Sequence, residues 1–255
     1  MTITKLNYDM YIHWILLEGC NFSCTYCYAH PRKGLPPKID ILRVIQRLDK
    51  INKVILFTFT GGEPFLISNF TEFIHELTKK HYVRIDTNLS LKKPCEKFMN
   101  TVNPKKVVEI TFSIHVLERE KRRMSLQDLC LLVKKFQKKG FRMIGNYVAY
   151  PPLVKRLKRD IEFFKSQGLE ILPTLFHGCY GSKTYPINDR GALAYSENDM
   201  QLISAMNPYA KIVTFKSKNK PCQAGVTAFV INHKYEVFPC LMMRKKLGNF
   251  FGEWK

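Results

Sequence analysis

Cys20-Asn-Phe-Ser-Cys24-Thr-Tyr-Cys27 follows an apolar stretch near the start of the chain and places three thiols in one short segment. All three thiolates can reach one small inorganic centre from a single loop. A cubane iron–sulfur cluster takes four cysteine ligands, so three leave one iron with an open coordination position. Zinc is the alternative, but it prefers two close pairs of ligands, and no fourth Cys or His at a fitting distance completes such a site, although His30 lies three residues beyond Cys27. The spacing therefore favours an iron–sulfur cluster.

A glycine pair follows the next predicted strand. Residues 54–60 are rich in β-branched and aromatic side chains, as in a buried strand, and they run into Gly61-Gly62-Glu63-Pro64. Paired glycines let the backbone approach a ligand closely, and the Glu and Pro that follow place a carboxylate on a stiffened turn. This turn suits an ammonium group, although the same residues can form an ordinary turn between a strand and a helix.

Together the two motifs resemble the radical S-adenosylmethionine superfamily, on the three cysteines, Tyr26 before the last of them, and the segment from Gly61 to Pro64. The resemblance implies a [4Fe–4S] cluster on the three cysteines, with a unique iron that binds the amino and carboxylate groups of S-adenosylmethionine. It further implies reductive cleavage to methionine and a 5′-deoxyadenosyl radical, which abstracts hydrogen from a substrate. Tyr26 would then lie near the adenine, and Glu63 with the glycine backbone would hold the methionine ammonium.

Later strand ends can also be compared with the superfamily. Asn88 follows the third predicted strand, where relatives often carry a Thr-Asn pair that faces the cosubstrate. Ser113 ends the fourth, and peptide-modifying relatives usually continue Ser-Ile-Asp-Gly, whereas this chain has His115 in place of the Asp. By itself His115 would be a strand-end histidine with a local hydrogen bond. The resemblance places an arginine for the methionine carboxylate further along, at Arg122 or Arg123.

Strand-like and helical segments alternate along most of the chain, which predicts parallel βαβ units with right-handed crossovers. The resemblance implies an α/β fold, a partial (β/α)6 TIM-like barrel. In such barrels function lies at the carboxyl ends of the strands, so the cysteine loop and the glycine pair are expected at the same rim. The predicted strands are residues 11–17, 54–60, 82–87, 106–114, 141–150 and 169–176, and the predicted helices are residues 39–48, 69–80, 91–100, 125–139 and 153–167.

The tail carries a second, weaker signature. Cys222-Gln-Ala-Gly225, a predicted strand at residues 228–231 and Glu236-Val-Phe-Pro-Cys240 resemble the opening of the auxiliary-cluster modules called SPASM or Twitch. In those modules the two cysteines flank a β-hairpin and begin a second iron–sulfur site.

Relatives with such modules continue with further cysteines, whereas none follows Cys240 in this chain, and Cys179 is the nearest candidate for a third ligand. Either a second cluster is incomplete and open to substrate, or the hairpin persists without metal. We divide the chain into a core barrel at residues 1–176 and a linker with a short Twitch-like region at residues 177–255.

Composition permits this fold. A chain of 255 residues can bury one core with a small appendage. Residues 1–9 are polar and the apolar run at residues 11–17 is too short to cross a membrane, so we expect neither a secretory signal nor a membrane association. Eight cysteines without an export signal suit a reducing compartment, and a cytoplasmic location is expected.

The chain is strongly basic, with 41 Lys and Arg against 21 Asp and Glu and a formal net charge of +20. A large positive field attracts nucleic acids and other polyanions. However, most basic bursts fall on predicted helices between apolar residues, as solvated faces do, and this interpretation is favoured.

The expected function is an enzyme that receives an electron from an external donor of the flavodoxin or ferredoxin type and abstracts hydrogen from a bound substrate. A peptide or protein side chain is the first choice of substrate, because SPASM-like tails most often accompany maturases. Dehydrogenation or rearrangement of a small molecule such as a sugar or nucleotide is the second. Modification of tRNA or DNA rests on charge alone. An iron–sulfur scaffold without turnover is the non-enzymatic alternative.

Overall fold

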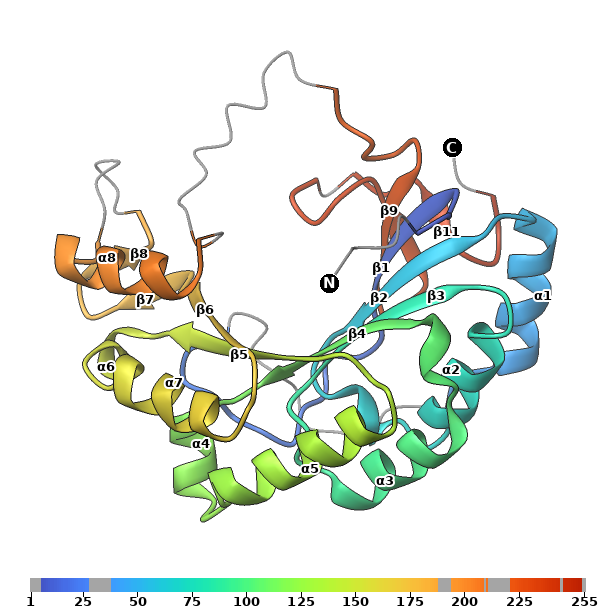
Figure 1. Cartoon of the computed structure of the whole chain (residues 1–255). Helices are drawn as coiled ribbons and strands as arrows, with labels where there is room; N and C mark the ends of the chain where they lie inside the picture. The colour runs from blue at the N-terminus through green and yellow to red at the C-terminus, as the bar shows by residue number, and fades with distance from the viewer. Residues whose placement is uncertain are drawn as a thin grey trace.

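The computed structural model describes residues 6–27, 38–187, 194–208, 210, 221–243 and 245–253. Within these residues, six parallel strands lie side by side in a curved sheet, in the order in which they occur in the chain (Figure 1). The six predicted strands are confirmed, with ends that differ by at most two residues. They are β1 (Met10–Ile15), β2 (Ile55–Thr60), β3 (Tyr82–Thr87), β4 (Val107–Ser113), β5 (Met143–Ala149) and β6 (Ile171–Leu175).

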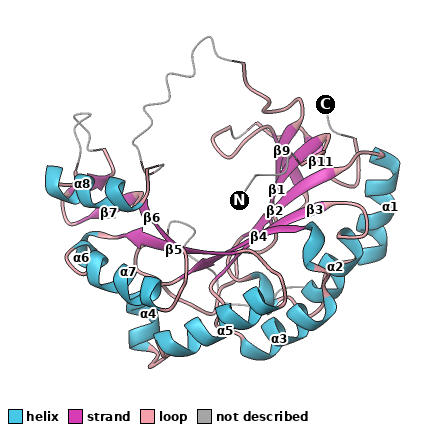
Figure 2. Cartoon of the chain, viewed as in Figure 1, coloured by secondary structure: helices cyan, strands magenta, loops and turns pink. Residues whose placement is uncertain are grey.

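Helices connect successive strands and cover the convex side of the curved sheet (Figure 2). The five predicted helices are present, but the one predicted from residue 153 is divided into two shorter helices, α6 and α7. The helix α4 was not predicted, because six residues are too few to show a period of 3.6. The helices are α1 (Ile41–Ile51), α2 (Phe70–Leu77), α3 (Lys92–Thr101), α4 (Val116–Lys121), α5 (Leu126–Lys138), α6 (Pro151–Val154), α7 (Leu157–Ser166) and α8 (Glu197–Met206), with 3-10 turns at η1 (Pro64–Leu66) and η2 (Pro104–Lys106).

Alternate residues of each strand separate the two faces of the sheet. Trp14 of β1 packs against Phe57 and Phe59 of β2 and against Phe73 of α2, with ring centroids 6.0 to 6.1 Å apart. These residues belong to the buried core between the sheet and its helices. Because side chains alternate along a strand, the residues between them point toward the concave face.

The tail extends the sheet past β1. β9 (Ala228–Ile231) runs parallel to β1, with Tyr11 opposite Ala228 and Trp14 opposite Ile231. β10 (Glu236–Phe238) pairs antiparallel with β9, as the hairpin prediction requires, and β11 (Gly248–Asn249) pairs with β10. The sheet order is therefore β11-β10-β9-β1-β2-β3-β4-β5-β6, and the hairpin continues the sheet of the barrel.

A second, two-stranded sheet follows β6 and was not predicted. It consists of β7 (Gly178–Tyr180) and β8 (Lys183–Tyr185), which are three residues long each and too short for a periodic signal. Among the helices that the structure describes, none is both long and apolar enough to cross a membrane.

Candidate functional site

The backbones of the glycine pair and the cysteine loop are bonded to each other. The Gly62 N–H donates to the Leu17 carbonyl at 2.9 Å, and the Glu63 N–H donates to the Gly19 carbonyl at 3.0 Å. A Cβ on Gly62 would lie 1.7 Å from the Gly19 carbonyl oxygen, and Gly61 has a φ of +140°, which side chains rarely allow. The close backbone approach that the sequence predicted toward a ligand thus also occurs between two loops of the chain.

The three cysteines of this loop are free thiols, each partly exposed. Cys20 Sγ accepts a hydrogen bond from the Phe22 N–H at 3.4 Å, and the Cys27 N–H donates to the Cys24 carbonyl at 3.0 Å. Burial raises the pKa of the Cys20 thiol. Burial, with a smaller contribution from the Glu118 carboxylate, raises the pKa of Cys24 to about 12. Burial thus favours the neutral thiol over the thiolate at both cysteines.

This donor set fits an iron–sulfur cluster better than a single metal ion. In the part of the chain that the structure describes, no three His, Cys, Asp or Glu side chains converge on a single-ion site. In a cubane cluster each cysteine binds its own iron, so the ligands need not converge on one point. A thiol that coordinates a metal is deprotonated outright, so metal binding overcomes the cost that burial imposes on the thiolate.

Glu63 joins the carboxyl ends of β2 and β3. Its carboxylate is 1% exposed and accepts hydrogen bonds from Phe65 N at 3.1 Å, Thr87 Oγ1 at 2.7 Å and Asn88 N at 2.6 Å. Burial raises the pKa of Glu63 to about 7, although these bonds act to lower it. Pro64 begins the buried turn η1 directly after it. The Glu63 carboxylate thus already accepts three hydrogen bonds within the chain. Binding of the methionine ammonium by Glu63 stays a prediction.

An amide network connects the cysteine loop to the loop after β3. Asn88 Nδ2 donates to Asn21 Oδ1 at 2.9 Å, and Asn21 Nδ2 donates to Ser90 Oγ at 2.7 Å. Ser113 ends β4 in register with Asn146 of β5, so it lies at the same rim. Asn88 and Ser113 were predicted from the sequence, whereas Asn21 and Ser90 were missed. The signal that could have found them is their position in the chain, since Asn21 follows Cys20 directly and Ser90 lies two residues after Asn88.

Arg119, also missed, is buried at this rim. It is 2% exposed, its Nε donates to the Ile114 carbonyl at 2.7 Å, and its Nη2 donates to the Asn88 carbonyl. Burial lowers the pKa of Arg119 to about 10, so the side chain remains a cation at neutral pH. Arg119 therefore holds the ends of β3 and β4 together.

The two arginines predicted to bind the cosubstrate lie further along the same segment. Arg122 Nε forms a 2.6 Å ion pair with Glu118, and its guanidinium carbon lies 5.2 Å from the centroid of the Phe22 ring in the cysteine loop. Arg123 is exposed and has a φ of +53°. Glu118 also accepts a hydrogen bond from the Ser23 N–H at 3.1 Å. Arg122 thus lies beside the cysteine loop and is paired with Glu118, the carboxylate that accepts a hydrogen bond from this loop.

Tyr26 and His115 form a contact between the cysteine loop and the start of α4. Tyr26 Oη lies 2.9 Å from His115 Nδ1, and the Tyr26 ring lies 5.0 Å from that of Tyr150. His115 has a φ of +49°, and burial lowers its pKa to about 4, so its ring is neutral at pH 7. The hydrogen bond expected for this strand-end histidine is therefore long-range, to the predicted adenine neighbour.

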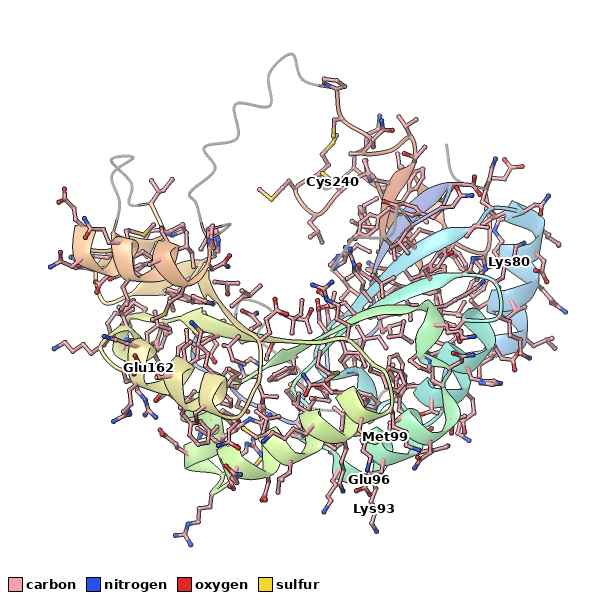
Figure 3. All side chains as sticks on the ribbon, viewed as in Figure 1. Lys80, Lys93, Glu96, Met99, Glu162 and Cys240 are labelled. Atoms are coloured by element: carbon pink, nitrogen blue, oxygen red, sulfur yellow. The ribbon has the colours of Figure 1, made fainter. Side chains whose placement is uncertain are left out.

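The tail cysteines lie at the opposite end of the strands. Cys222 precedes β9, which runs parallel to β1, and Cys240 follows β10, which pairs antiparallel with β9. Cys240 is labelled in Figure 3. A Cβ on Gly225 would lie 3.4 Å from Pro239 Cβ, so the two cysteine segments meet at the base of the hairpin. Both cysteines are therefore near the amino ends of the parallel strands.

The structure does not bring Cys179 to this pair. Cys179 belongs to β7, which follows the carboxyl end of β6 at the other edge of the sheet. The neighbouring Tyr180 ring lies 5.3 Å from that of Tyr150, on the side of the cysteine loop. Among the described residues, a three-cysteine site from Cys179, Cys222 and Cys240 is thus not formed.

Curated relatives match short stretches of the chain. GTP 3′,8-cyclase of Mesorhizobium japonicum is 31% identical over 75 residues, which cover 27% of this chain and 22% of the cyclase. The sporulation killing factor maturation protein SkfB of Bacillus subtilis is 36% identical over 61 residues, covering 23% of this chain and 15% of SkfB. Each match thus spans less than a quarter of the relative.

Solved structures match nearly the whole chain. Streptococcus suis SuiB bound to S-adenosylmethionine aligns with a TM-score of 0.63 at 17% identity, over 96% of this chain and 64% of SuiB. The enzyme anSMEcpe with bound AdoMet aligns with a TM-score of 0.62 at 19% identity, over 96% of this chain and 78% of anSMEcpe. The chain therefore shares their fold and spans less than two thirds of SuiB.

The model of the radical SAM superfamily matches residues 14–164, more than half of the chain. This match contains the cysteine loop, the glycine pair, Asn88, Ser113 and the arginine segment. The chain belongs to the radical SAM superfamily, whose members use a [4Fe–4S] cluster and S-adenosylmethionine.

Proposed function

We propose that this protein is an enzyme that uses S-adenosylmethionine to abstract a hydrogen atom from a peptide or protein side chain. The observation that carries the proposal is the meeting of four segments at the carboxyl ends of β1 to β4. They are the cysteine loop, the glycine pair, the loop at Asn88 and the start of α4 at Arg119. Catalytic groups of parallel barrels gather at this end.

The loop cysteines would hold three irons and leave the fourth open to the amino and carboxylate groups of the cosubstrate. When bound, the cluster and the cosubstrate supply a 5′-deoxyadenosyl radical that removes hydrogen from the substrate. The chain itself supplies binding and orientation, through cations, hydrogen-bond donors and buried loops.

Arg122 is the better of the two predicted partners for the methionine carboxylate. Its side chain is 40% exposed and its guanidinium lies beside Phe22 in the cysteine loop, whereas no contact between Arg123 and this loop is found among the described residues. Arginine has five N–H donors, and its ion pair with Glu118 leaves donors for an anionic group. Arg119 has the supporting task of holding the Asn88 loop in place.

The peptide choice is supported by the relatives. SuiB has been solved bound to the precursor peptide SuiA, and that structure aligns over 97% of this chain. The enzyme anSMEcpe has been solved with the Cp18Cys peptide, and it aligns over 96%. SkfB is a maturation protein. A nucleotide substrate is the second candidate, favoured by the 31% identity to GTP 3′,8-cyclase over 75 residues.

The test is anaerobic reconstitution with iron and sulfide, followed by S-adenosylmethionine and a reductant. We expect methionine and 5′-deoxyadenosine from the wild type and neither from the variant with Cys20, Cys24 and Cys27 replaced by Ala. Cleavage by the triple variant would refute the proposal. Incubation with a short precursor peptide encoded beside the gene, followed by mass spectrometry, separates a peptide substrate from GTP in parallel reactions.

A further inference from the structure

The concave face of the barrel carries a polar row directly beneath the cofactor rim. His13, Thr58, Arg84 and Glu109 lie side by side in register across β1, β2, β3 and β4. These positions alternate with core residues that face the helices, and all four are partly exposed. The row therefore lies on the face that the connecting helices leave uncovered (Figure 1).

A second row lies closer to the rim. Asp86 of β3 is in register with Thr111 of β4, whose hydroxyl donates a hydrogen bond to Glu109 Oε1 at 3.4 Å. Asp86 immediately precedes Thr87, which donates to Glu63 in the rim. The Asp86 carboxylate is thus one strand position below the loops that would hold the cofactors.

The charges of the two rows are not those of the whole molecule. Arg84 lies opposite Glu109 in the register of β3 and β4, and Asp86 lies two residues beyond Arg84 on β3. Glu109 raises the pKa of Asp86 and Arg84 lowers it. Burial is the main cause that raises the pKa of Asp86 to about 6, with a further contribution from Glu109. In a chain with a formal charge of +20, the charged side chains described at these rows include as many acids, Asp86 and Glu109, as arginines, Arg84 and the neighbouring Arg142.

One donor in this surface has no partner. Arg84 Nε is buried and, among the described residues, makes no hydrogen bond. Glu109 has its closest cation at Arg142, at 3.7 Å, on a side chain that is half exposed. The surface thus offers carboxylate acceptors and an unpartnered N–H donor, which together match the donors and acceptors of an amide.

We propose that this concave surface selects a peptide segment with a neutral or cationic side chain that bears N–H donors, and that it rejects a nucleoside triphosphate. The proposal rests on the proposed function and names its substrate class. Asp86 and Glu109 accept hydrogen bonds from the substrate, and Arg84 donates to a carbonyl oxygen. A triphosphate would bring several negative charges against the carboxylates of Asp86 and Glu109, which is a repulsive arrangement.

The test measures binding, so it does not depend on turnover. Three peptides that differ only in a central Lys, Gln or Glu are compared with GTP on reconstituted protein with S-adenosylmethionine, at about 150 mM salt to screen the surface charge. On the wild type, we expect the Lys and Gln peptides to bind about tenfold more tightly than the Glu peptide and GTP, or about 1.4 kcal/mol. This order is opposite to that expected from the net charge.

The variant Asp86→Asn with Glu109→Gln removes both acids from the concave surface. In it we expect the difference among the peptides to fall below about threefold and GTP to bind more tightly than to the wild type. The matched control, Glu72→Gln with Glu76→Gln, removes two acids from α2 on the outside and should keep the wild-type order. Glu109→Gln alone replaces the double variant if the latter does not fold.

Preference for GTP in the wild type, or an unchanged difference in the double variant, would overturn the inference. Either result is distinguishable from failure of the proposed function, which is read from 5′-deoxyadenosine. If the protein cleaves S-adenosylmethionine and yet prefers GTP, the proposed radical chemistry stands and the proposed peptide substrate does not.

Discussion

The two cysteine-bearing ends of the barrel differ in how firmly the chain supports them. At the carboxyl ends of the strands, the cysteine loop is bonded to three other segments. Ser23 N–H donates to Glu118 of α4, Asn21 is bonded to Asn88 after β3, and the Glu63 N–H donates to Gly19 after β2. The protein itself therefore holds this loop in place from three sides.

At the amino ends, Cys222 and Cys240 have less support. Cys222 is exposed, and Met242, two residues beyond Cys240, is 90% exposed. The third cysteine that the sequence suggested, Cys179, lies at the other edge of the sheet. The difference teaches that two candidate metal sites with similar cysteine motifs can differ in how many bonds neighbouring segments make to the loop that carries the cysteines.

The largest effect is expected from removing the three cysteines of the cysteine loop. Replacing Cys20, Cys24 and Cys27 by Ala should abolish stoichiometric binding of a four-iron cluster, because the loop supplies all its protein ligands. Replacing Cys222 and Cys240 by Ala should leave most of the iron in place. Iron and sulfide analysis after anaerobic reconstitution measures the cluster content of both variants. A full cluster in the triple variant would mean that the amino ends of the strands, and not the cysteine loop, hold the cluster.

The glycine pair tests the backbone contact of the rim. Gly62→Ala places a Cβ 1.7 Å from the Gly19 carbonyl oxygen and should lower the free energy of unfolding by about 3 kcal/mol. Gly252→Ala is the matched control, since its nearest atom outside the neighbouring residues would be 3.8 Å away. Denaturant titration of the cluster-free proteins measures both, and equal stability would mean that the loops separate easily.

Arg119 and Arg122 test which arginine holds the rim and which binds the cosubstrate. Arg119→Gln should cost about 2 kcal/mol of unfolding free energy, because its buried hydrogen bonds to two carbonyls are lost. Arg122→Gln should cost less than about 1 kcal/mol, as expected for a partly exposed ion pair.

The two arginine variants also differ in their expected affinity for S-adenosylmethionine. In Arg122→Gln this affinity should fall about tenfold, because the charge-assisted contact with the methionine carboxylate is lost. Equilibrium dialysis on reconstituted protein measures it. Unchanged affinity in this variant would leave Arg123 as the remaining predicted partner.

The smallest effect concerns the amino ends. His81 accepts a hydrogen bond from Ile55 N at 3.2 Å, and burial lowers its pKa to about 4 from 6.5. Between these two pKa values His81 is protonated more in the unfolded chain than in the folded one. The free energy of unfolding therefore rises with pH in this range and falls as the pH is lowered. Between about pH 5.5 and pH 6.5 His81 should contribute about 1 kcal/mol, and His81→Gln should reduce the rise by that amount in denaturant titrations.

The central strands and the cysteine loop could be predicted because their signals are local. Each of β1 to β6 is a run of apolar or alternating residues, and the cysteine spacing is contained in eight residues. The rim residues that were missed depend on contacts between distant segments. Glu118 reaches Ser23 across 95 positions, and Arg119 reaches Asn88 across 31.

The start of α4 explains why Arg119 was missed. His115 takes a left-handed conformation before this helix and so determines which of the charged residues at 118–123 face the rim. Positive φ is uncommon for histidine, and no sequence pattern signalled it here. The pairing of β9 with β1 was equally inaccessible, because register between strands more than 200 residues apart leaves no periodic trace.

That pairing also sets the order in which the barrel can be completed on the ribosome. β1 is made first, yet one of its edges has no partner until β9 has been synthesised. At about 5 to 20 residues per second, the interval after β2 lasts roughly ten to thirty seconds. An unpaired strand edge is a template for other chains during that time. Slow synthesis of the tail should therefore increase aggregation, even when every residue of the rim is intact.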